Sequence, residues 1–165
     1  MSSLKEARLS VEKLADFLQL PFPLREEQLQ ACASVLAGQD TFVVVPTGFG
    51  KSLIYQCLPL LASKVATNVQ SVCSNFIVVV VSPLVALMQD QVAHCHQSGW
   101  SALYWHGGCS PVEVTAAARG KYSLLFVSPE TLVGNRDFHG LLSSGVFTQR
   151  LICIAIDEAH CVQTW

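Results

Sequence analysis

The sequence predicts an α/β fold with three layers, in which a mostly parallel central sheet is flanked by helices. The strand-like segments are continuous apolar runs, such as FIVVVVS at 76–82, rather than alternating ones. Strands of this kind are buried on both faces, as in a parallel sheet covered by helices. The runs also alternate with helical patterns, which is typical of strand–helix–strand units. With 51% hydrophobic and 13% charged residues, the 165-residue chain can bury a substantial core.

The N-terminal part is expected to be helical. Apolar residues at helical spacing predict a short amphipathic helix at 4–18, and the prolines of LPFP at 20–23 end it. We interpret residues 1–23 as an N-terminal helical extension. A second helix is expected from about 24 to 37, closed by Gly38, because glycine commonly follows the last turn of a helix.

The rest of the chain is expected to hold the sheet. The β-branched run TFVVV at 41–45 predicts the first strand, LIYQCLPLLA at 53–62 predicts a helix, and the polar segment at 62–75 predicts mostly surface loop. The later segments are, in order, the strand at 76–82, a helix at about 84–98, the apolar SALYWHG at 101–107, a small-residue segment at 111–119, the strand in SLLFVSPETL at 123–132, a helix into the 140s, and the strand in LICIAIDEAH at 151–160.

Charge and hydropathy narrow the possible functions. The chain has 10 basic and 12 acidic residues, so nucleic-acid binding has no electrostatic signature and must rest on motifs. The apolar runs are too short to cross a bilayer, and the N-terminus lacks a signal-peptide core, so we expect no membrane partner. The 7 cysteines are singly spaced, which predicts reduced thiols in an intracellular protein. His-Cys-His at 94–96 is disfavoured as a metal site, because adjacent helical residues point in different directions.

The segment VVVPTGFGKSL at 43–53 has the pattern of a phosphate-binding loop between a strand and a helix. Its glycines let the backbone pass close to phosphates, and the N-terminus of the next helix attracts anions. Lys51 is expected to reach the β- and γ-phosphates, and Ser52 to hold Mg²⁺. The first glycine of the longer Walker A pattern is absent, and a glycine turn with a solvated lysine is the alternative. The residues predicted to bind nucleotide here are Thr47, Gly48, Gly50, Lys51 and Ser52.

Two adjacent acids, Asp157 and Glu158, follow the last apolar strand. Carboxylates at a strand end are often simply solvated. With a phosphate loop in the same chain, however, Asp157 fits as a ligand of Mg²⁺, which prefers oxygen, and Glu158 as the base that deprotonates a water. We therefore predict Lys51, Asp157 and Glu158 as catalytic residues, with ATP and Mg²⁺ as cofactors.

Ligands of parallel sheets bind at the carboxyl ends of the strands. Polar segments follow four of the predicted strands, and we expect these segments to share one edge of the sheet. They are PTGFGKS at 46–52, SPLVALMQDQ at 82–91, SPETL at 128–132 and DEAH at 157–160.

Together these motifs resemble the first RecA-like lobe of a superfamily 2 helicase, and most closely the RecQ family. The resemblance runs from Leu24 to Trp165, through LREEQ, PTGFGKS, VVVSPLVALMQDQV, LLFVSPETL and DEAHCVQTW. It implies the three-layer RecA-like fold of a P-loop NTPase over 24–165. It also implies that Arg25 and Gln28 contact adenine, a role that suits an amide able to donate and accept.

By the same resemblance, the parent protein is expected to be an ATP-dependent 3′–5′ DNA helicase acting at a single-stranded tail next to a duplex junction, in the nucleus if eukaryotic and otherwise in the cytoplasm. A second RecA-like lobe completes such enzymes, so we expect the 165-residue chain alone not to unwind DNA. A non-catalytic nucleotide-binding or interaction module is the alternative, and a small P-loop kinase fits the motifs poorly. The residues implied to contact DNA are Ser82, Pro83, Gln89, Ser128, His160 and Trp165.

Some of these residues have an alternative interpretation, and three positions differ from the usual family pattern. Ser-Pro at 82–83 and 128–129 can simply cap helices, and Trp165 can be a packing aromatic. The family usually has an aromatic residue where this chain has Leu24, and a third glycine where it has Phe49. It usually has Ser-Gln before the loop tryptophan, where this chain has Gln163 and Thr164. A divergent adenine pocket and DNA-coupling loop are therefore expected.

Overall fold

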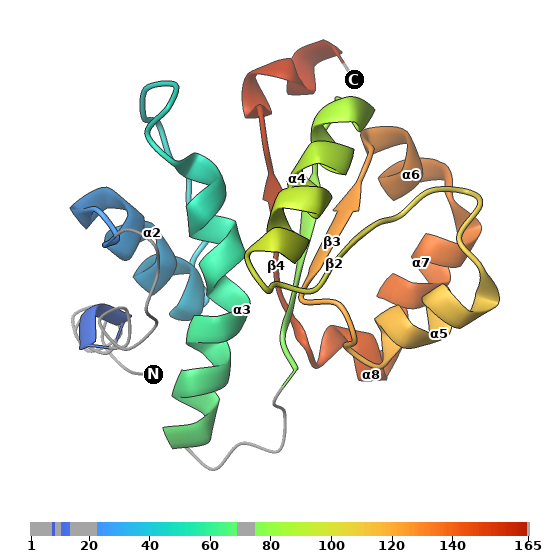
Figure 1. Cartoon of the computed structure of the whole chain (residues 1–165), viewed down its shortest axis with the longest axis horizontal. Helices are drawn as coiled ribbons and strands as arrows, with labels where there is room; N and C mark the ends of the chain where they lie inside the picture. Colours follow the sequence, from blue (N-terminus) through green and yellow to red (C-terminus); the bar gives the residue numbers. More distant parts are fainter. Residues whose placement is uncertain (1–7, 9–10, 14–22, 69–74, 165) are drawn as a thin grey trace. The chain divides into compact units, whose positions relative to one another are not determined.

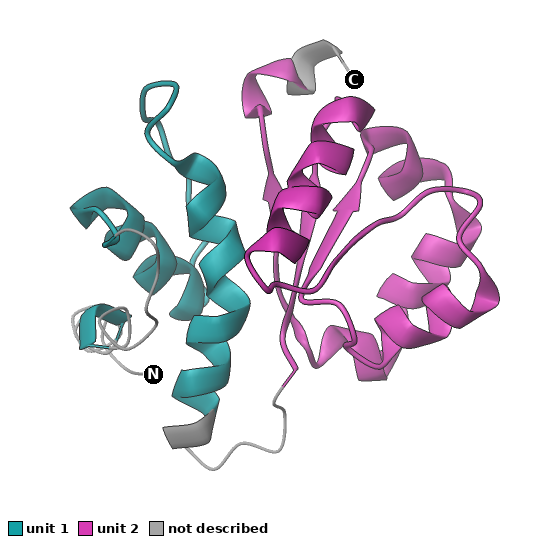
Figure 2. Cartoon of the chain, in the orientation of Figure 1, with its two compact units in different colours: residues 1–74 teal, residues 75–165 magenta. Residues whose placement is uncertain are grey.

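A computed structural model describes residues 8, 11–13, 23–68 and 75–164 of the chain. These residues fall into two compact units, Met1–Ser74 and Asn75–Trp165, which Figure 2 colours separately. The predicted helix at 4–18 lies mostly outside the described residues. None of the helices in the described ranges is long and apolar enough to cross a membrane.

The first unit contains two packed helices, α2 (Glu26–Leu36) and α3 (Lys51–Asn68). The expected helix at 24–37 is confirmed, and Gly38 follows it with φ at 77°. The prediction of surface loop from residue 62 is wrong as far as Asn68, because α3 continues through this segment. Ala62 and Ala66 are both buried and lie four residues apart, so the apolar face of the helix extends past its expected end.

The predicted strand at 41–45 is not present in the described structure, where residues 39–46 have no regular secondary structure. Phe42 is 82% exposed and Val44 is similarly open to solvent. A β-branched run favours a strand only where a neighbouring strand pairs with its backbone and packs its side chains. No such ladder partner is assigned to this run among the described residues, which explains why propensity alone failed here.

The second unit is built on a four-stranded parallel sheet in the order β2-β3-β1-β4. Figure 1 labels β2, β3 and β4 of this sheet. The sheet confirms the predicted α/β class. Residues 78–81 of β1 pair in register with 124–127 of β3, while β4 pairs with the other side of β1 across a bulge at its start. The strands are β1 (Ile77–Val81), β2 (Ala102–Tyr104), β3 (Leu124–Val127) and β4 (Leu151–Ile156).

Helices lie on both faces of this sheet. Alternate residues of β1 and β3 pack with Trp105 and with α5 (Pro111–Ala118), α7 (Arg136–Leu142) and α8 (Gly145–Thr148) in one apolar cluster. The other helix, α4 (Val85–Gln97), contacts β2 and β3 and buries Met88 and Cys95. The continuous apolar composition of β1 and β3 therefore has the expected cause, since both of their faces are covered. In β4, by contrast, Ile154 and Ile156 are exposed.

The predicted helix leading into the 140s is three short helices rather than one. Asn135 ends α6 (Pro129–Gly134), and its side chain accepts a hydrogen bond of 2.8 Å from the backbone N–H of Phe138 in α7. Asparagine favours such a cap because its short side chain can replace the missing backbone acceptor. The bend allows Phe138 to reach the core, where its ring meets Trp105 at a centroid distance of 5.3 Å.

Candidate functional site

The glycine loop of the first unit leads directly into an α-helix, as predicted. Phe49 N–H donates to the carbonyl of Pro46 over 3.2 Å, which closes a turn, and Gly48 and Gly50 have φ values of 79° and 91°. Such backbone angles are open to glycine and costly for other residues. The loop ends at Lys51, the first residue of α3, so Lys51 and Ser52 both lie in the first helical turn.

The start of α3 has the properties of an anion site. The helix has 18 residues and no acidic residue in its first turn, so no carboxylate of its own opposes the positive end of its dipole. The two positive-φ glycines bring backbone close to this end. These features fit the phosphates of ATP, and the hydroxyl of Ser52 is a suitable oxygen ligand for Mg²⁺. Thr47 is exposed beside the first of these glycines.

Gln28 and Arg25 lie against the same loop. Gln28 is only 3% exposed, and its Nε2 donates to the carbonyls of Phe49 at 3.3 Å and Gly50 at 3.0 Å. Its Oε1 accepts a hydrogen bond of 2.8 Å from the backbone N–H of Arg25. The Arg25 guanidinium lies over the Phe49 ring, 4.5 Å from its centroid. The structure thus brings together the predicted base-contacting residues and the phosphate loop.

The two acids lie at the carboxyl end of β4 in the second unit. Asp157 N–H donates to the carbonyl of Val81 over 2.9 Å, which continues the β4–β1 ladder to this residue. The carboxylate of Asp157 then accepts from the backbone N–H of Glu158 over 3.0 Å. Glu158 has φ at 52°, a left-handed conformation that costs a non-glycine residue about 1–2 kcal/mol. Its carboxylate pairs with the exposed His160 at 3.3 Å.

Three of the four predicted polar segments share one edge of the sheet. Ser82 follows β1, Ser128 follows β3 and Asp157 follows β4, and all three strands run parallel. The glycine loop belongs to the other unit. Its place on the same edge stays a prediction, and so does a shared Mg²⁺ site of Ser52 and Asp157.

The two Ser-Pro segments differ in their hydrogen bonds. Ser128 caps α6, since its hydroxyl accepts from the backbone N–H of Thr131 over 3.2 Å. Ser82 is 2% exposed, and its hydroxyl has no hydrogen-bond partner among the described residues. The helix α4 begins three residues later, after Leu84, which provides no side-chain cap. An unpaired buried hydroxyl therefore lies next to an uncapped helix N-terminus.

The structure gives the other described residues predicted to contact DNA no distinctive hydrogen bonding or burial. Pro83 is half-buried between β1 and α4, and Gln89 is exposed on α4. His160 lies in the short 3₁₀ helix Ala159–Thr164, with its side chain exposed. Trp165 and the side chains of Gln163 and Thr164 lie outside the described structure, so their roles remain predictions.

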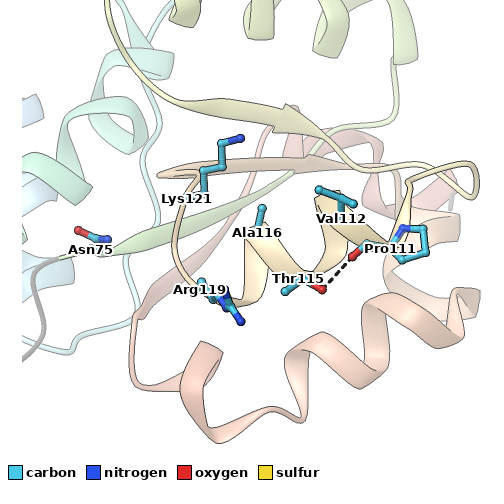
Figure 3. Close-up of a pocket in the computed structure, with 7 residues that line it drawn as sticks. All are labelled: Asn75, Pro111, Val112, Thr115, Ala116, Arg119 and Lys121. Carbon is cyan, nitrogen blue, oxygen red and sulfur yellow. Dashed lines mark hydrogen bonds between the residues drawn. The ribbon is translucent and has the colours of Figure 1, made fainter.

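Sequence reasoning did not foresee the cavity of about 580 Å³ shown in Figure 3. Asn75 and Lys121, which help to line it, precede β1 and β3, so the cavity lies at the amino ends of these strands. The predicted site residues of this unit follow the carboxyl ends instead. The remaining lining residues are Pro111, Val112, Thr115, Ala116 and Arg119.

The His-Cys-His segment lies in α4, where its residues have separate surroundings. Cys95 is fully buried, and burial raises the pKa of its thiol to about 11. His96 Nε2 is hydrogen-bonded at 2.9 Å to the carbonyl of Ala102. Across the described ranges, no three His, Cys, Asp or Glu side chains form a group that could hold a metal ion.

The family model and the relatives compared with this chain are all helicases. The family model for the DEAD/DEAH box helicase matches residues 25–165. The chain is 35% identical over 143 residues to "ATP-dependent helicase wrn-1" of Caenorhabditis elegans, covering 86% of this chain and 12% of that protein. It is 33% identical over 162 residues to "ATP-dependent DNA helicase Q1" of Mus musculus, covering 93% of this chain and 23% of that protein.

A third relative is "ATP-dependent DNA helicase Q-like 5" of Arabidopsis thaliana, which is 35% identical over 178 aligned positions. That match covers all of this chain and 18% of the relative. The chain therefore spans less than a quarter of the length of each of these three relatives. The resemblance to RecQ-family helicases that the motifs predicted is confirmed, because the matched relatives include helicases of the Q1 and Q-like types.

Proposed function

Because this chain belongs to the DEAD/DEAH box helicase family, we propose that it is the ATP-binding lobe of an ATP-dependent 3′–5′ DNA helicase. One observation carries the nucleotide part of this proposal. The glycine loop opens the positive end of α3, and Gln28 contacts the backbone of the same loop. The residues that we propose for phosphate and for base binding are thus adjacent within one unit.

Within this proposal, each site residue is assigned one role. The backbone of Thr47–Gly50 and the Lys51 ammonium bind the phosphates, while Arg25 and Gln28 contact the adenine. Ser52 and Asp157 are the residues that hold Mg²⁺, which when bound neutralises charge on the transferred phosphoryl group. Glu158 orients and deprotonates the attacking water.

The DNA part of the proposal rests on the carboxyl edge of the sheet and on the relatives, of which several are named as DNA helicases. We infer that a backbone phosphate of the tracked single strand binds at Ser82 and the first turn of α4. The uncapped N–H groups of that turn and the unpaired Ser82 hydroxyl are donors without an acceptor of their own. Neutral donors of this kind explain how a chain of net charge −2 can contact nucleic acid.

Within this proposal, Gln89 and His160 extend the DNA-contacting surface from their exposed positions on α4 and after β4. Ser128 has a smaller role, because its hydroxyl already caps α6. Trp165 is proposed to couple DNA contact to hydrolysis. Unwinding needs a second lobe that supplies further cations to the phosphates, an effect worth about 10³–10⁵ in rate in related enzymes. We propose that the parent protein acts in the nucleus if it is eukaryotic.

The test is ATP turnover by the parent protein with single-stranded DNA. Lys51→Ala is expected to lower turnover at least a hundredfold, roughly the loss caused by removing one transition-state donor. The matched control is Lys64→Ala, which removes an exposed lysine from the same helix and is expected to leave turnover unchanged. Equal turnover by the Lys51 and Lys64 variants excludes the proposed phosphate role.

Glu158→Gln is the second variant in this test. It keeps the size and polarity of the side chain but removes the base, so ATP is expected to bind with nearly normal affinity while hydrolysis falls about 10²–10⁴-fold. Exposed Glu12 provides the control, as Glu12→Gln. Unchanged hydrolysis in Glu158→Gln excludes Glu158 as the base. A wild-type parent protein that binds nucleotide without hydrolysing it supports a non-catalytic binding module instead.

A further inference from the structure

The cavity in Figure 3 has the size of a binding pocket and no role in the proposed function. Its volume of about 580 Å³ lies within the range of about 300–1,000 Å³ that is usual for ligand pockets. It lies at the amino ends of β1 and β3, whereas Ser82, Ser128 and Asp157 follow the carboxyl ends of their strands. None of the residues assigned to ATP or DNA lines it. An occupant of this cavity therefore has to be inferred from the lining itself.

One wall of the cavity is a stripe along the outer face of α5. The opposite face of the helix carries the buried Ala117, which belongs to the apolar cluster with α7 and α8. Val112, on the outer stripe, is 77% exposed. Residues three or four apart share one helix face, and the stripe has this spacing. Its members are Pro111, Val112, Thr115, Ala116 and Arg119. The wall thus combines exposed apolar side chains with a cation at its end.

A glycine turn after α5 brings a second cation to the cavity. Gly120 has φ at 75°, and the N–H of Lys121 donates to the carbonyl of Ala116 over 3.0 Å. A Cβ atom at Gly120 would lie only 3.0 Å from the Cβ of Asn75, another lining residue. The positive φ and this close approach both require glycine. The turn therefore holds Arg119 and Lys121 one residue apart on either side of it.

The cations of the second unit gather at this edge of the sheet. Its Lys and Arg residues are Arg119, Lys121, Arg136 and Arg150. The first two line the cavity, and Arg150 packs beside the glycine turn. The described lining contains no acidic residue, and no described carboxylate lies within ion-pair distance of Arg119 or Lys121. Glu113, the acid of α5, instead accepts a hydrogen bond of 2.7 Å from the backbone N–H of Ser110. The described residues thus leave the positive charge of the cavity without a paired acid.

The two properties of the lining together indicate the class of ligand. Guanidinium and ammonium groups form charge-assisted hydrogen bonds with carboxylates, and Val112 offers apolar surface beside them. A nucleic-acid backbone pairs with the cations alone, whereas an acidic peptide with an apolar side chain uses both features. We propose that the cavity is a docking site for an acidic segment of a partner protein. The carboxylates of this segment pair with Arg119 and Lys121, and an apolar side chain between them packs on Val112.

The test measures the binding of short fluorescein-labelled peptides to the full 165-residue chain by fluorescence anisotropy. The probes have the sequence Glu-Asp-X-Asp-Glu, in which X is Leu, Val or Phe. At least one is expected to bind with a dissociation constant below about 1 mM, and more weakly as salt screens the charges. Replacing Glu and Asp by Gln and Asn is expected to weaken binding about tenfold, and X as Ser about fivefold.

Variants of the chain locate the site. Arg119→Gln combined with Lys121→Gln is expected to weaken binding about fivefold or more, roughly the combined effect of two exposed ion pairs. The control is Arg136→Gln, an exposed cation of the same unit outside the cavity, which is expected to leave the affinity unchanged.

A second pair of variants tests the apolar contact. Val112→Asn is expected to weaken binding about fivefold, while Val133→Asn, at a valine that is 75% exposed and outside the cavity lining, is expected to have no effect. Thermal unfolding of every variant checks the fold, which is expected to be retained because the changed side chains are exposed.

Several results overturn the proposal. They are binding of no acidic peptide below about 1 mM, equal binding of acidic and neutral peptides, and unchanged affinity in the double Gln variant of Arg119 and Lys121. An equal loss in Arg136→Gln identifies general attraction to positive charge and also contradicts it. Labelled single-stranded DNA is measured in the same assay. DNA binding that falls in the double Gln variant, when no acidic peptide binds, identifies a nucleic-acid surface instead.

Discussion

Ser82→Ala is expected to make the protein more stable while weakening the proposed contact with DNA. The Ser82 hydroxyl is buried, and no described residue bonds to it. An unpaired buried hydroxyl costs about 1–3 kcal/mol relative to water. Removing the oxygen also loses the packing of one buried atom. This loss costs less than about 1 kcal/mol, by comparison with burial of one methylene group. The net expectation is a gain of about 1 kcal/mol.

Ser128→Ala is the matched control with the opposite expected sign. Ser128 is also buried, also follows a strand of the same sheet and also precedes proline, but its hydroxyl caps α6. Loss of a serine cap costs about 0.5–2 kcal/mol. For a chain of this length, 1 kcal/mol corresponds to roughly 2–4 °C in melting temperature. The two alanine variants are therefore expected to melt on opposite sides of the wild type.

Thermal unfolding of the chain followed by circular dichroism tests the stability half of this prediction. Fluorescence anisotropy of labelled single-stranded DNA with the parent protein, at one fixed salt concentration, tests the binding half. A hydrogen bond to a charged group contributes about 1.5–3 kcal/mol, so Ser82→Ala is expected to weaken binding about tenfold or more. A melting temperature that falls as far for Ser82→Ala as for Ser128→Ala shows that the Ser82 hydroxyl is already satisfied. That result also overturns the proposed phosphate site at α4.

Three further predictions concern the packing, the strained turn and the thiols. Phe138→Ala is expected to lower the free energy of unfolding by about 3–5 kcal/mol, because the ring is fully buried against Trp105. The control, Val112→Ala at an exposed site, is expected to change it by less than about 0.5 kcal/mol, and urea titrations measure both. Glu158→Gly is expected to gain about 1 kcal/mol by relieving a φ of 52°, and a loss of stability contradicts the strain. Burial raises the pKa of the Cys95 thiol to about 11, so this thiol remains protonated at pH 8. Mass spectrometry after iodoacetamide treatment is therefore expected to find Cys95 unmodified when the half-buried Cys161 has reacted. Labelling of Cys95 at the same rate contradicts its burial.

The sequence by itself determined the elements whose causes are local. Continuous apolar runs predicted β1, β3 and β4. For β1 and β3 the cause is burial on both faces of a parallel sheet, which needs no alternation, whereas β4 leaves Ile154 and Ile156 exposed. Gly38 marked the end of α2, and the spacing of glycine, lysine and serine marked the loop before α3. These features depend on the backbone freedom of single residues or on the composition of a few neighbours, so a short stretch of chain contains them completely.

Tertiary structure decided the features that depend on distant residues. TFVVV at 41–45 has the composition of a strand, but strand formation needs a partner whose backbone comes from another part of the chain. The stack of Phe49 on Arg25 joins residues 24 positions apart, and neither residue alone predicts it. Such contacts form only when the fold brings their partners together, so their strength cannot be read from local composition.

The two Ser-Pro segments illustrate most directly which features are local and which depend on tertiary structure. From sequence, each was equally a helix cap or a phosphate contact. In the structure, α6 begins immediately after Ser128, so its hydroxyl is used in the cap, while α4 begins three residues after Ser82 and leaves that hydroxyl unpaired among the described residues. The residues determined what each hydroxyl can do. The residue at which each helix starts decided which hydroxyl is left unpaired among the described residues.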